Sequence, residues 1–468
     1  MFKAAFWSSF DKVVYQALNF ILAIIIAIYL GPKELGAIAI INGYVYLLNI
    51  FVDSGLTISI IRNNKITNKE ISSIFIFNLS VSILFVIITL LSSSLIESFL
   101  NVKNLAYYLN LSSLILLFNS FSFVRYAKLE QNMEFKKVTF ANVFSIFLSG
   151  LICWIMLYLD YGIFSVVIFG ISSSLIRNLI YFFITPRFKL ERFKYLDLQP
   201  HLKFGKNLLF SSSVEAIYNN GFPILITKLF TGYSAGIFFQ SKRLIDGPVN
   251  LISTSSRRLF LPIASRYGND IKETNKFLID ILKLVNYILI FMVALLFINA
   301  EYIIVSVMGE KWIESVLILK ILIFGMIFYT PFFLCLDVFK ITGDSSTYSK
   351  AILISRIFSI ILILFSSIFG FLSLVIFFSF SQLLMFLYSV YLVNQKYEYS
   401  IKEILETVVP YIIIMVLGLV VVNFIKFGIN PISVLLAKSI VFLILYIIST
   451  IFILKYNPLL SLYKQIRK

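Results

Sequence analysis

The sequence predicts an all-α protein that crosses a membrane many times. Apolar runs of about 20 residues recur along the whole chain, and a run of that length crosses roughly 30 Å of hydrocarbon as a helix. Only 13% of the 468 residues are charged, about half of the roughly 25% found in soluble domains. The mean hydropathy is +0.95. Together these observations exclude most soluble enzymes and soluble binding modules.

The apolar runs predict about fourteen transmembrane helices joined by short connectors. The seventh and eighth runs are the least apolar, because they carry a triplet of serines and several charged residues. The first run, 6–30, is long for the apolar core of a signal peptide, so we expect it to be a retained span. The predicted spans are 7–30, 36–61, 71–96, 105–127, 138–159, 163–184, 208–230, 235–263, 277–298, 316–339, 351–369, 372–393, 404–425 and 432–454.

Positive charge is concentrated in every second connector. Because Lys and Arg mark the cytoplasmic side of a membrane protein, this alternation predicts that both termini are cytoplasmic. Removing one of the two doubtful spans would place all later basic clusters outside, so the charge pattern supports fourteen. The net charge of +17 lies at the predicted helix ends and forms no separate basic domain, which argues against a nucleic-acid partner.

An internal repeat predicts two similar halves. Residues 30–36 resemble residues 230–236, and residues 162–169 resemble residues 370–377. Each pair opens spans that run in the same direction, so the repeat is parallel, and this is a common plan for transporters. We therefore expect a six-helix lobe at 1–185, a basic cytoplasmic linker at 186–207, a second six-helix lobe at 208–395, and two further helices with a basic tail at 396–468.

Residues typical of enzyme active sites are almost absent. The single histidine, His201, lies in a basic connector and is expected to be solvated. Cys153 and Cys335 both lie inside apolar runs, which predicts no disulfide framework. We find no metal-ligand cluster, phosphate-binding loop or nucleophile elbow. The sequence therefore predicts a protein that is not an enzyme and that needs no cofactor or metal.

Charged residues inside the predicted spans are the candidate site. A Lys, Arg or Asp at the centre of a membrane helix costs about 2.5–3.5 kcal/mol, so such a residue is expected to face a cavity or a partner. Basic side chains outnumber acidic ones, which favours an anionic ligand, and the planar donors of Arg suit phosphate oxygens. The cationic candidates are Lys12, Arg177, Lys242, Arg243 and Lys320; the carboxylates that could couple an ion or pair with a cation are Asp53, Glu215 and Asp246.

Each of these residues also has a simpler interpretation. Lys12 and Arg177 could extend to the cytoplasmic interface, and Glu215 could pair with Lys242 or Arg243. Asp53 could cap or kink a broken helix. Lys242 and Arg243 are the best cavity candidates, because adjacent helical residues point about 100° apart, so that one can bind while the other pairs.

A set of short stretches, in order along residues 1–345, resembles a known family. No single stretch is diagnostic, but the ordered set resembles the Wzx-type polysaccharide flippases of the multidrug/oligosaccharidyl-lipid/polysaccharide exporter superfamily. The family often has Asn-Arg where this chain has Phe239-Gln240, so Lys242 or Arg243 is expected to substitute for the missing charge. The stretches are 6–9, 30–36, 51–55, 133–137, 218–220, 242–244, 248–253, 260–262 and 309–312.

The resemblance implies a flippase in the cytoplasmic (inner) membrane of a bacterium. Its substrate would be an undecaprenyl-diphosphate-linked oligosaccharide, a unit of O-antigen, capsule or exopolysaccharide, moved by alternating access through a cationic cavity between two lobes. The resemblance makes the lipid bilayer a partner, with a polysaccharide polymerase and other assembly proteins as candidate partners.

Three other functions remain open at this point. A drug/cation antiporter of the same superfamily should prefer an acidic cavity, whereas the intramembrane charges here are mainly basic. A membrane-embedded polysaccharide polymerase or glycosyltransferase should carry a sizeable extramembrane loop or an acidic catalytic pair, and the sequence shows neither. A scaffold protein should not need charges inside its spans.

Overall fold

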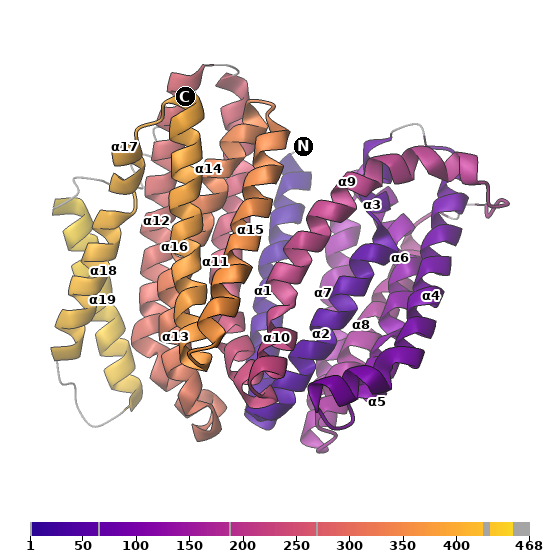
Figure 1. Cartoon of the computed structure of the whole chain (residues 1–468), viewed down its shortest axis with the longest axis horizontal. Coiled ribbons are helices and arrows are strands. Elements are labelled where there is room, and N and C mark those ends of the chain that lie inside the picture. The colour runs from indigo at the N-terminus through magenta and orange to yellow at the C-terminus, as the bar shows by residue number, and fades with distance from the viewer. Residues whose placement is uncertain (1, 64–65, 187–188, 268–269, 425–430, 453–468) are drawn as a thin grey trace. The chain divides into compact units, whose positions relative to one another are not determined.

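The structure is a computed structural model that describes residues 2–63, 66–186, 189–267, 270–424 and 431–452. These residues form helices joined by short connectors, with no strand in the described ranges (Figure 1). The chain divides into two compact units, Met1–Gln240 and Ser241–Lys468. The boundary falls inside one long helix, so the opening turns of that helix belong to the first unit.

The described part of the N-terminal unit forms ten complete helices and the start of an eleventh. Pro32 opens the second helix, where its missing N–H costs nothing, and the Glu34 carboxylate accepts a hydrogen bond from the Gly31 N–H at 2.8 Å. The helices are α1 (Phe2–Tyr29), α2 (Pro32–Asp53), α3 (Leu56–Arg62), α4 (Asn68–Leu100), α5 (Leu105–Ser112), α6 (Leu114–Gln131), α7 (Phe135–Tyr158), α8 (Ile163–Ile184), α9 (Tyr195–Asn220), α10 (Phe222–Leu229) and the first turns of α11 (Gly232–Ala264).

The C-terminal unit begins within α11 and continues through helices of similar length. Three of its helices begin at a side-chain cap, in which Asp270, Asp344 or Ser400 accepts a hydrogen bond from a backbone N–H of the first turn. The elements are η1 (Ser265–Tyr267), α12 (Ile271–Glu301), η2 (Tyr302–Met308), η3 (Glu310–Trp312), α13 (Ile313–Met326), α14 (Tyr329–Ile341), α15 (Ser345–Ser367), α16 (Phe371–Tyr397), α17 (Ile401–Glu406), α18 (Val409–Phe424) and α19 (Pro431–Phe452).

The prediction of an all-α polytopic membrane protein is confirmed, and every predicted span falls on a helix or a pair of consecutive helices. Among the described residues, eleven helical segments are long and apolar enough to cross a membrane, and the described apolar part of α1, Val13–Tyr29, is shorter. The two weakest predicted spans fall on α9 with α10 and on α11. These helices are not among the eleven, as their charged and serine residues led us to expect.

One helix extends beyond its predicted span. Helix α9 begins at Tyr195, whereas the sequence predicted a span from 208, so residues 195–207 of the predicted linker are helical. The physical reason is packing: Leu198 is buried in an apolar cluster with Leu56, Ile60 and Ile71. The wider division into two lobes, a linker and two extra helices remains a prediction.

The two copies of the first repeat approach each other closely within the N-terminal unit. A Cβ atom added to Gly36 would lie 1.9 Å from the carbonyl oxygen of Gly232, and one added to Gly236 would lie 1.7 Å from that of Pro32. The contact is reciprocal, because 32 and 36 correspond to 232 and 236 in the repeat. Only glycine allows this approach of α2 and α11, so the repeated glycines have a packing role.

Candidate anion-binding site

In the N-terminal unit, a chain of polar side chains links three helices. Arg177 on α8 donates a hydrogen bond from Nη2 to Oδ1 of Asn119 on α6, at 3.1 Å. The Nδ2 of Asn119 donates to Oδ1 of Asn49 on α2, at 3.0 Å. The Nδ2 of Asn49 donates in turn to the carbonyl oxygen of Val45, at 3.1 Å. All three side chains are half-buried, so the arginine is held among helices and not at the end of one.

Arg177 keeps its positive charge uncancelled. Among the residues that the structure describes, Asn119 is its hydrogen-bond partner and no carboxylate forms an ion pair with it. A guanidinium has five N–H donors, and the single bond to Asn119 leaves most of them available. Of the predicted cations, Arg177 therefore has the clearest capacity to bind an anion.

Asp53 serves as a helix cap at the break between α2 and α3. Ser54 and Gly55 both have left-handed backbone conformations, with φ of 49° and 71°. The Asp53 carboxylate accepts hydrogen bonds from the Thr57 hydroxyl and from the Thr57 backbone N–H, the latter at 3.2 Å. The structure thus shows the capping alternative for Asp53, while a role in ion coupling remains a prediction.

Glu215 lies on α9 in the N-terminal unit, where its Oε1 accepts a hydrogen bond from Nδ2 of Asn219 at 3.0 Å. The side chain is half-buried. A role for Glu215 in coupling an ion or in pairing with a cation of α11 remains a prediction.

The C-terminal unit brings together Lys242 and Asp246 of α11. Their Nζ and Oδ2 atoms are 2.5 Å apart, one helical turn from each other. The sequence suggested that one of the adjacent residues Lys242 and Arg243 pairs while the other binds, and the structure identifies Lys242 as a paired residue. Arg243 is half-buried on the same turn.

The last two cationic candidates differ in how well they can be placed. Lys320 of α13 in the C-terminal unit has its ammonium 5.3 Å from the ring centre of Phe297, a geometry that attracts a cation to an aromatic face. Lys12 is part of α1, but its side chain lies outside the described residues.

Sequence reasoning missed a charged cluster in the C-terminal unit. Asp337 of α14 is fully buried and accepts two hydrogen bonds from Arg257 of α11, at 2.6 and 2.9 Å. Lys340, one turn further along α14, lies 3.1 Å from the same carboxylate. Two cations thus surround one carboxylate. The sequence did contain a signal for this cluster, because Asp337 lies inside the predicted span 316–339. The list of charges inside predicted spans omitted it.

Arg356 of α15 was missed for the same reason. It lies inside the predicted span 351–369, yet it is fully buried. Its Nη1 lies 3.6 Å from the sulfur of Met385, and its guanidinium lies 5.7 Å from the ring centre of Phe333. A complete count of charges inside predicted spans would have found both Arg356 and Asp337.

The expectation that His201 is solvated is wrong. The side chain is 4% exposed, because α9 extends further than predicted and carries His201 into the packing. Its Nδ1 is 2.7 Å from the Ser59 hydroxyl, and its Nε2 is 3.5 Å from a carboxylate oxygen of Glu70. His201 therefore joins α9 to α3 and α4, which are all in the N-terminal unit.

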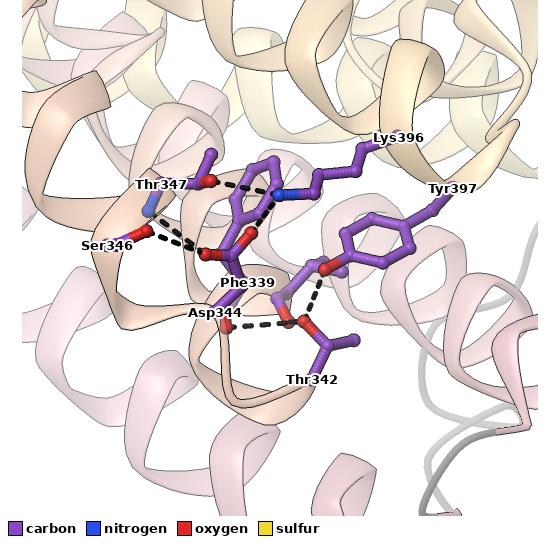
Figure 2. Close-up of polar contacts among 8 residues, drawn as sticks. Phe339, Thr342, Asp344, Ser346, Thr347, Lys396 and Tyr397 are labelled. Carbon is purple, nitrogen blue, oxygen red and sulfur yellow. Dashed lines mark hydrogen bonds and ion pairs between the residues drawn. The ribbon is translucent and has the colours of Figure 1, made fainter.

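Figure 2 shows a polar clasp in the C-terminal unit, where the connector before α15 meets the end of α16. The Asp344 carboxylate forms an ion pair with Lys396, which also donates to the Thr347 hydroxyl at 3.0 Å. The hydroxyl groups of Thr342 and Tyr397 are 2.5 Å apart. The Lys396 ammonium and hydrogen bonds from Thr347 hold the pKa of Asp344 well below its usual value of 3.8.

The chain belongs to the polysaccharide biosynthesis protein family, which matches residues 25–317. It is 22% identical over 324 residues to an uncharacterized membrane protein of the cps region of Klebsiella pneumoniae, covering 68% of this chain and 67% of that protein. It is 22% identical to the succinoglycan biosynthesis transport protein ExoT of Rhizobium meliloti, covering 69% and 66%. It is 20% identical to the lipopolysaccharide biosynthesis protein WzxC of Escherichia coli, covering 68% and 65%. The chain thus spans slightly less than two thirds of the last two relatives.

Solved structures establish the fold. The structure of the lipid II flippase MurJ in an inward closed conformation is similar with a TM-score of 0.76 and 18% identity, covering 97% of this chain and 99% of that one. An inward-facing multidrug resistance transporter of the MATE family has a TM-score of 0.64 and 13% identity, covering 81% and 95%. The resemblance predicted from short sequence stretches is therefore confirmed at the level of the family and the fold.

Proposed function

We propose that this protein is a flippase that moves an undecaprenyl-diphosphate-linked oligosaccharide across the bacterial cytoplasmic membrane by alternating access. Membership of a polysaccharide biosynthesis family and a fold like that of a lipid II flippase support this function. The observation that carries the proposal is Arg177, a cation among membrane helices that is held by an amide and keeps its charge. A diphosphate is the part of such a substrate that needs this charge.

The remaining cationic candidates fit the same function. Arg243 of α11 and Lys320 of α13 would contribute further positive charge, and Asp246 would hold the Lys242 side chain one turn away on the same helix. In this proposal both termini face the cytoplasm, as the distribution of Lys and Arg suggests. The oligosaccharide would then enter from the side where it is made, and a polymerase would act on it after transfer.

A cation antiporter is less well supported. An antiporter for cationic drugs needs a carboxylate that is free to bind a cation, whereas the Asp53 carboxylate accepts two hydrogen bonds from Thr57. The Asp246 carboxylate already pairs with Lys242. A polymerase or glycosyltransferase would require an acidic catalytic pair. Such a pair is less well supported, because Asp53 and Asp246 have other partners and Glu215 accepts a hydrogen bond from Asn219.

The proposal is tested by reconstituting the full chain in liposomes that contain a fluorescent lipid-linked oligosaccharide, and by measuring its transfer between leaflets. In cells, the double variant Lys242→Ala, Arg243→Ala should abolish surface polysaccharide while the protein stays in the membrane. A matched double variant, Lys350→Ala, Lys402→Ala, removes the same charge from two exposed positions and should leave polysaccharide normal. Transfer at the rate of protein-free liposomes would refute the function.

A further inference from the structure

The chemistry of Arg177 fixes the direction of the whole hydrogen-bond chain. An arginine side chain can only donate, so the group of Asn119 that faces it must be the carbonyl oxygen. The Nδ2 of Asn119 then points to Asn49, which must present its own oxygen. The Nδ2 of Asn49 is left to donate to the Val45 carbonyl oxygen. The Val45 carbonyl of α2 thereby orients the Asn49 amide, and Asn49 orients the Asn119 amide. The Asn119 oxygen then faces the guanidinium of Arg177.

Both amides orient the arginine without neutralising it. A carboxylate at position 119 would hold the guanidinium more tightly, but it would also cancel its charge. Leaving a charge uncancelled among membrane helices is costly, so a fold that needed only a link between α6 and α8 would gain nothing from it. The arrangement is suited to a ligand that supplies the missing negative charge.

We infer that Asn119, supported by Asn49, is a positioning residue that aims Arg177 at the diphosphate of the lipid-linked substrate. This inference rests on the proposed function and deepens it. The neutral amide determines which lipids the site accepts: a lipid that ends in phosphate groups replaces the missing counter-charge, and the corresponding lipid alcohol does not. Selection at this site therefore depends on the head group and not on the lipid chain.

The decisive variant is Asn119→Asp, which changes shape little and places a carboxylate beside the guanidinium. The full chain is placed in nanodiscs of phosphatidylcholine, and binding of undecaprenyl diphosphate and of undecaprenol is measured separately. We expect the affinity for the diphosphate to fall at least about tenfold, while binding of the alcohol does not change. Asn119→Gln, which keeps a neutral amide, should recover part of the affinity.

Combining variants at positions 119 and 177 shows whether Asn119 acts through Arg177 or contacts the diphosphate by itself. If Asn119 acts through Arg177, then Asn119→Asp should cause no further loss of diphosphate affinity in an Arg177→Ala background. The matched control is Asn299→Asp on α12, where the amide bonds to Leu295 and Ser439 and not to an arginine. This control should keep the preference for the diphosphate.

Four outcomes would overturn the inference. The first is an Asn119→Asp protein that retains its diphosphate affinity. The second is an Asn119→Asp protein that loses both lipids equally, as it would if the residue were merely structural, and the third is an unaltered protein with no preference for the diphosphate. Replacing part of the phosphatidylcholine by phosphatidylglycerol tests a general phosphate site, and equal competition by that lipid would also refute it. Because binding is measured without transport, a protein that binds as expected but moves no lipid would refute the flippase function and leave the positioning role intact.

Discussion

Two arginines, one in each compact unit, are held in opposite ways. In the N-terminal unit, Arg177 is oriented by the amide of Asn119. In the C-terminal unit, Arg257 makes two hydrogen bonds to the fully buried carboxylate of Asp337. A neutral acceptor fixes a guanidinium and leaves its charge for a ligand, whereas a buried carboxylate uses that charge for itself. In the proposed function, this difference in partner makes Arg177 a binding residue and Arg257 a structural one.

The repeat makes the same contrast at equivalent positions. The alignment that pairs Gly162 with Gly370 also pairs Arg177 with Met385, both 208 positions apart. In the C-terminal unit, the charge near Met385 comes from Arg356 of α15, whose guanidinium lies against the Met385 sulfur. Arg356 is fully buried. The N-terminal unit thus has a half-buried cation at this position, whereas the C-terminal unit has a fully buried cation next to the matching position.

The largest effect should follow from Arg257→Ala. This change leaves the fully buried Asp337 with only the partly exposed Lys340 as a counter-ion, and breaking a buried ion pair costs about 3–5 kcal/mol. We expect a marked fall in the temperature of unfolding in detergent and in the amount of protein in the membrane. Lys340→Ala should cost less, because Arg257 still satisfies the carboxylate. An Arg257→Ala protein as stable as the parent would show that the ion pair does not stabilise the unit.

Arg177→Ala should affect transport strongly and stability less than Arg257→Ala does. It removes one hydrogen bond between a charged guanidinium and a neutral amide, worth about 1.5–3 kcal/mol, so stability should fall less than in Arg257→Ala. Transport of the lipid-linked substrate should fall at least about tenfold, because the cation for the diphosphate is lost. Arg177→Lys keeps the charge without the planar fork and should retain part of the activity. The contrast between the two arginines is tested by measuring the unfolding temperature and the transport rate of both variants. An Arg177→Ala protein that unfolds as readily as Arg257→Ala would contradict it.

Most of the fold could be predicted from the sequence because each prediction used a property that acts locally. Apolar length indicates a span, and the placement of Lys and Arg indicates its direction. The two weak predicted spans, which hydropathy alone did not identify, were kept because of the charge pattern, and the structure has helices α9 and α11 at these positions. The repeat was also visible, since Gly36 and Gly236 recur at matching positions. Its reciprocal backbone contact, however, depends on how the helices cross.

The site was predicted less completely because pairing is not a local property. The sequence identified Arg177, Lys242 and Asp246 as intramembrane charges, but it could not show that an amide holds the first and that the other two pair. Asp337 and Arg356 were overlooked inside strongly apolar runs. The position of His201 was wrong because the start of α9 depends on the packing of Leu198 against distant residues.

The smallest effect should come from the clasp of Asp344 and Lys396, a third way of holding a cation, in which Lys396 is exposed and Asp344 is partly exposed. Surface ion pairs are screened by water and salt, so Asp344→Asn should change overall stability little. It should, however, speed amide hydrogen exchange in residues 342–347, which Asp344 holds by capping α15. The pKa of Asp344 in the folded protein lies below its usual value of 3.8. Protection of residues 342–347 from exchange is therefore complete above pH 3.8. It is lost as the pH falls through the lower pKa of the folded protein. Exchange of parent and variant should therefore differ at pH 7 and converge only well below pH 4. Equal exchange at pH 7 would show that the clasp does not order this connector.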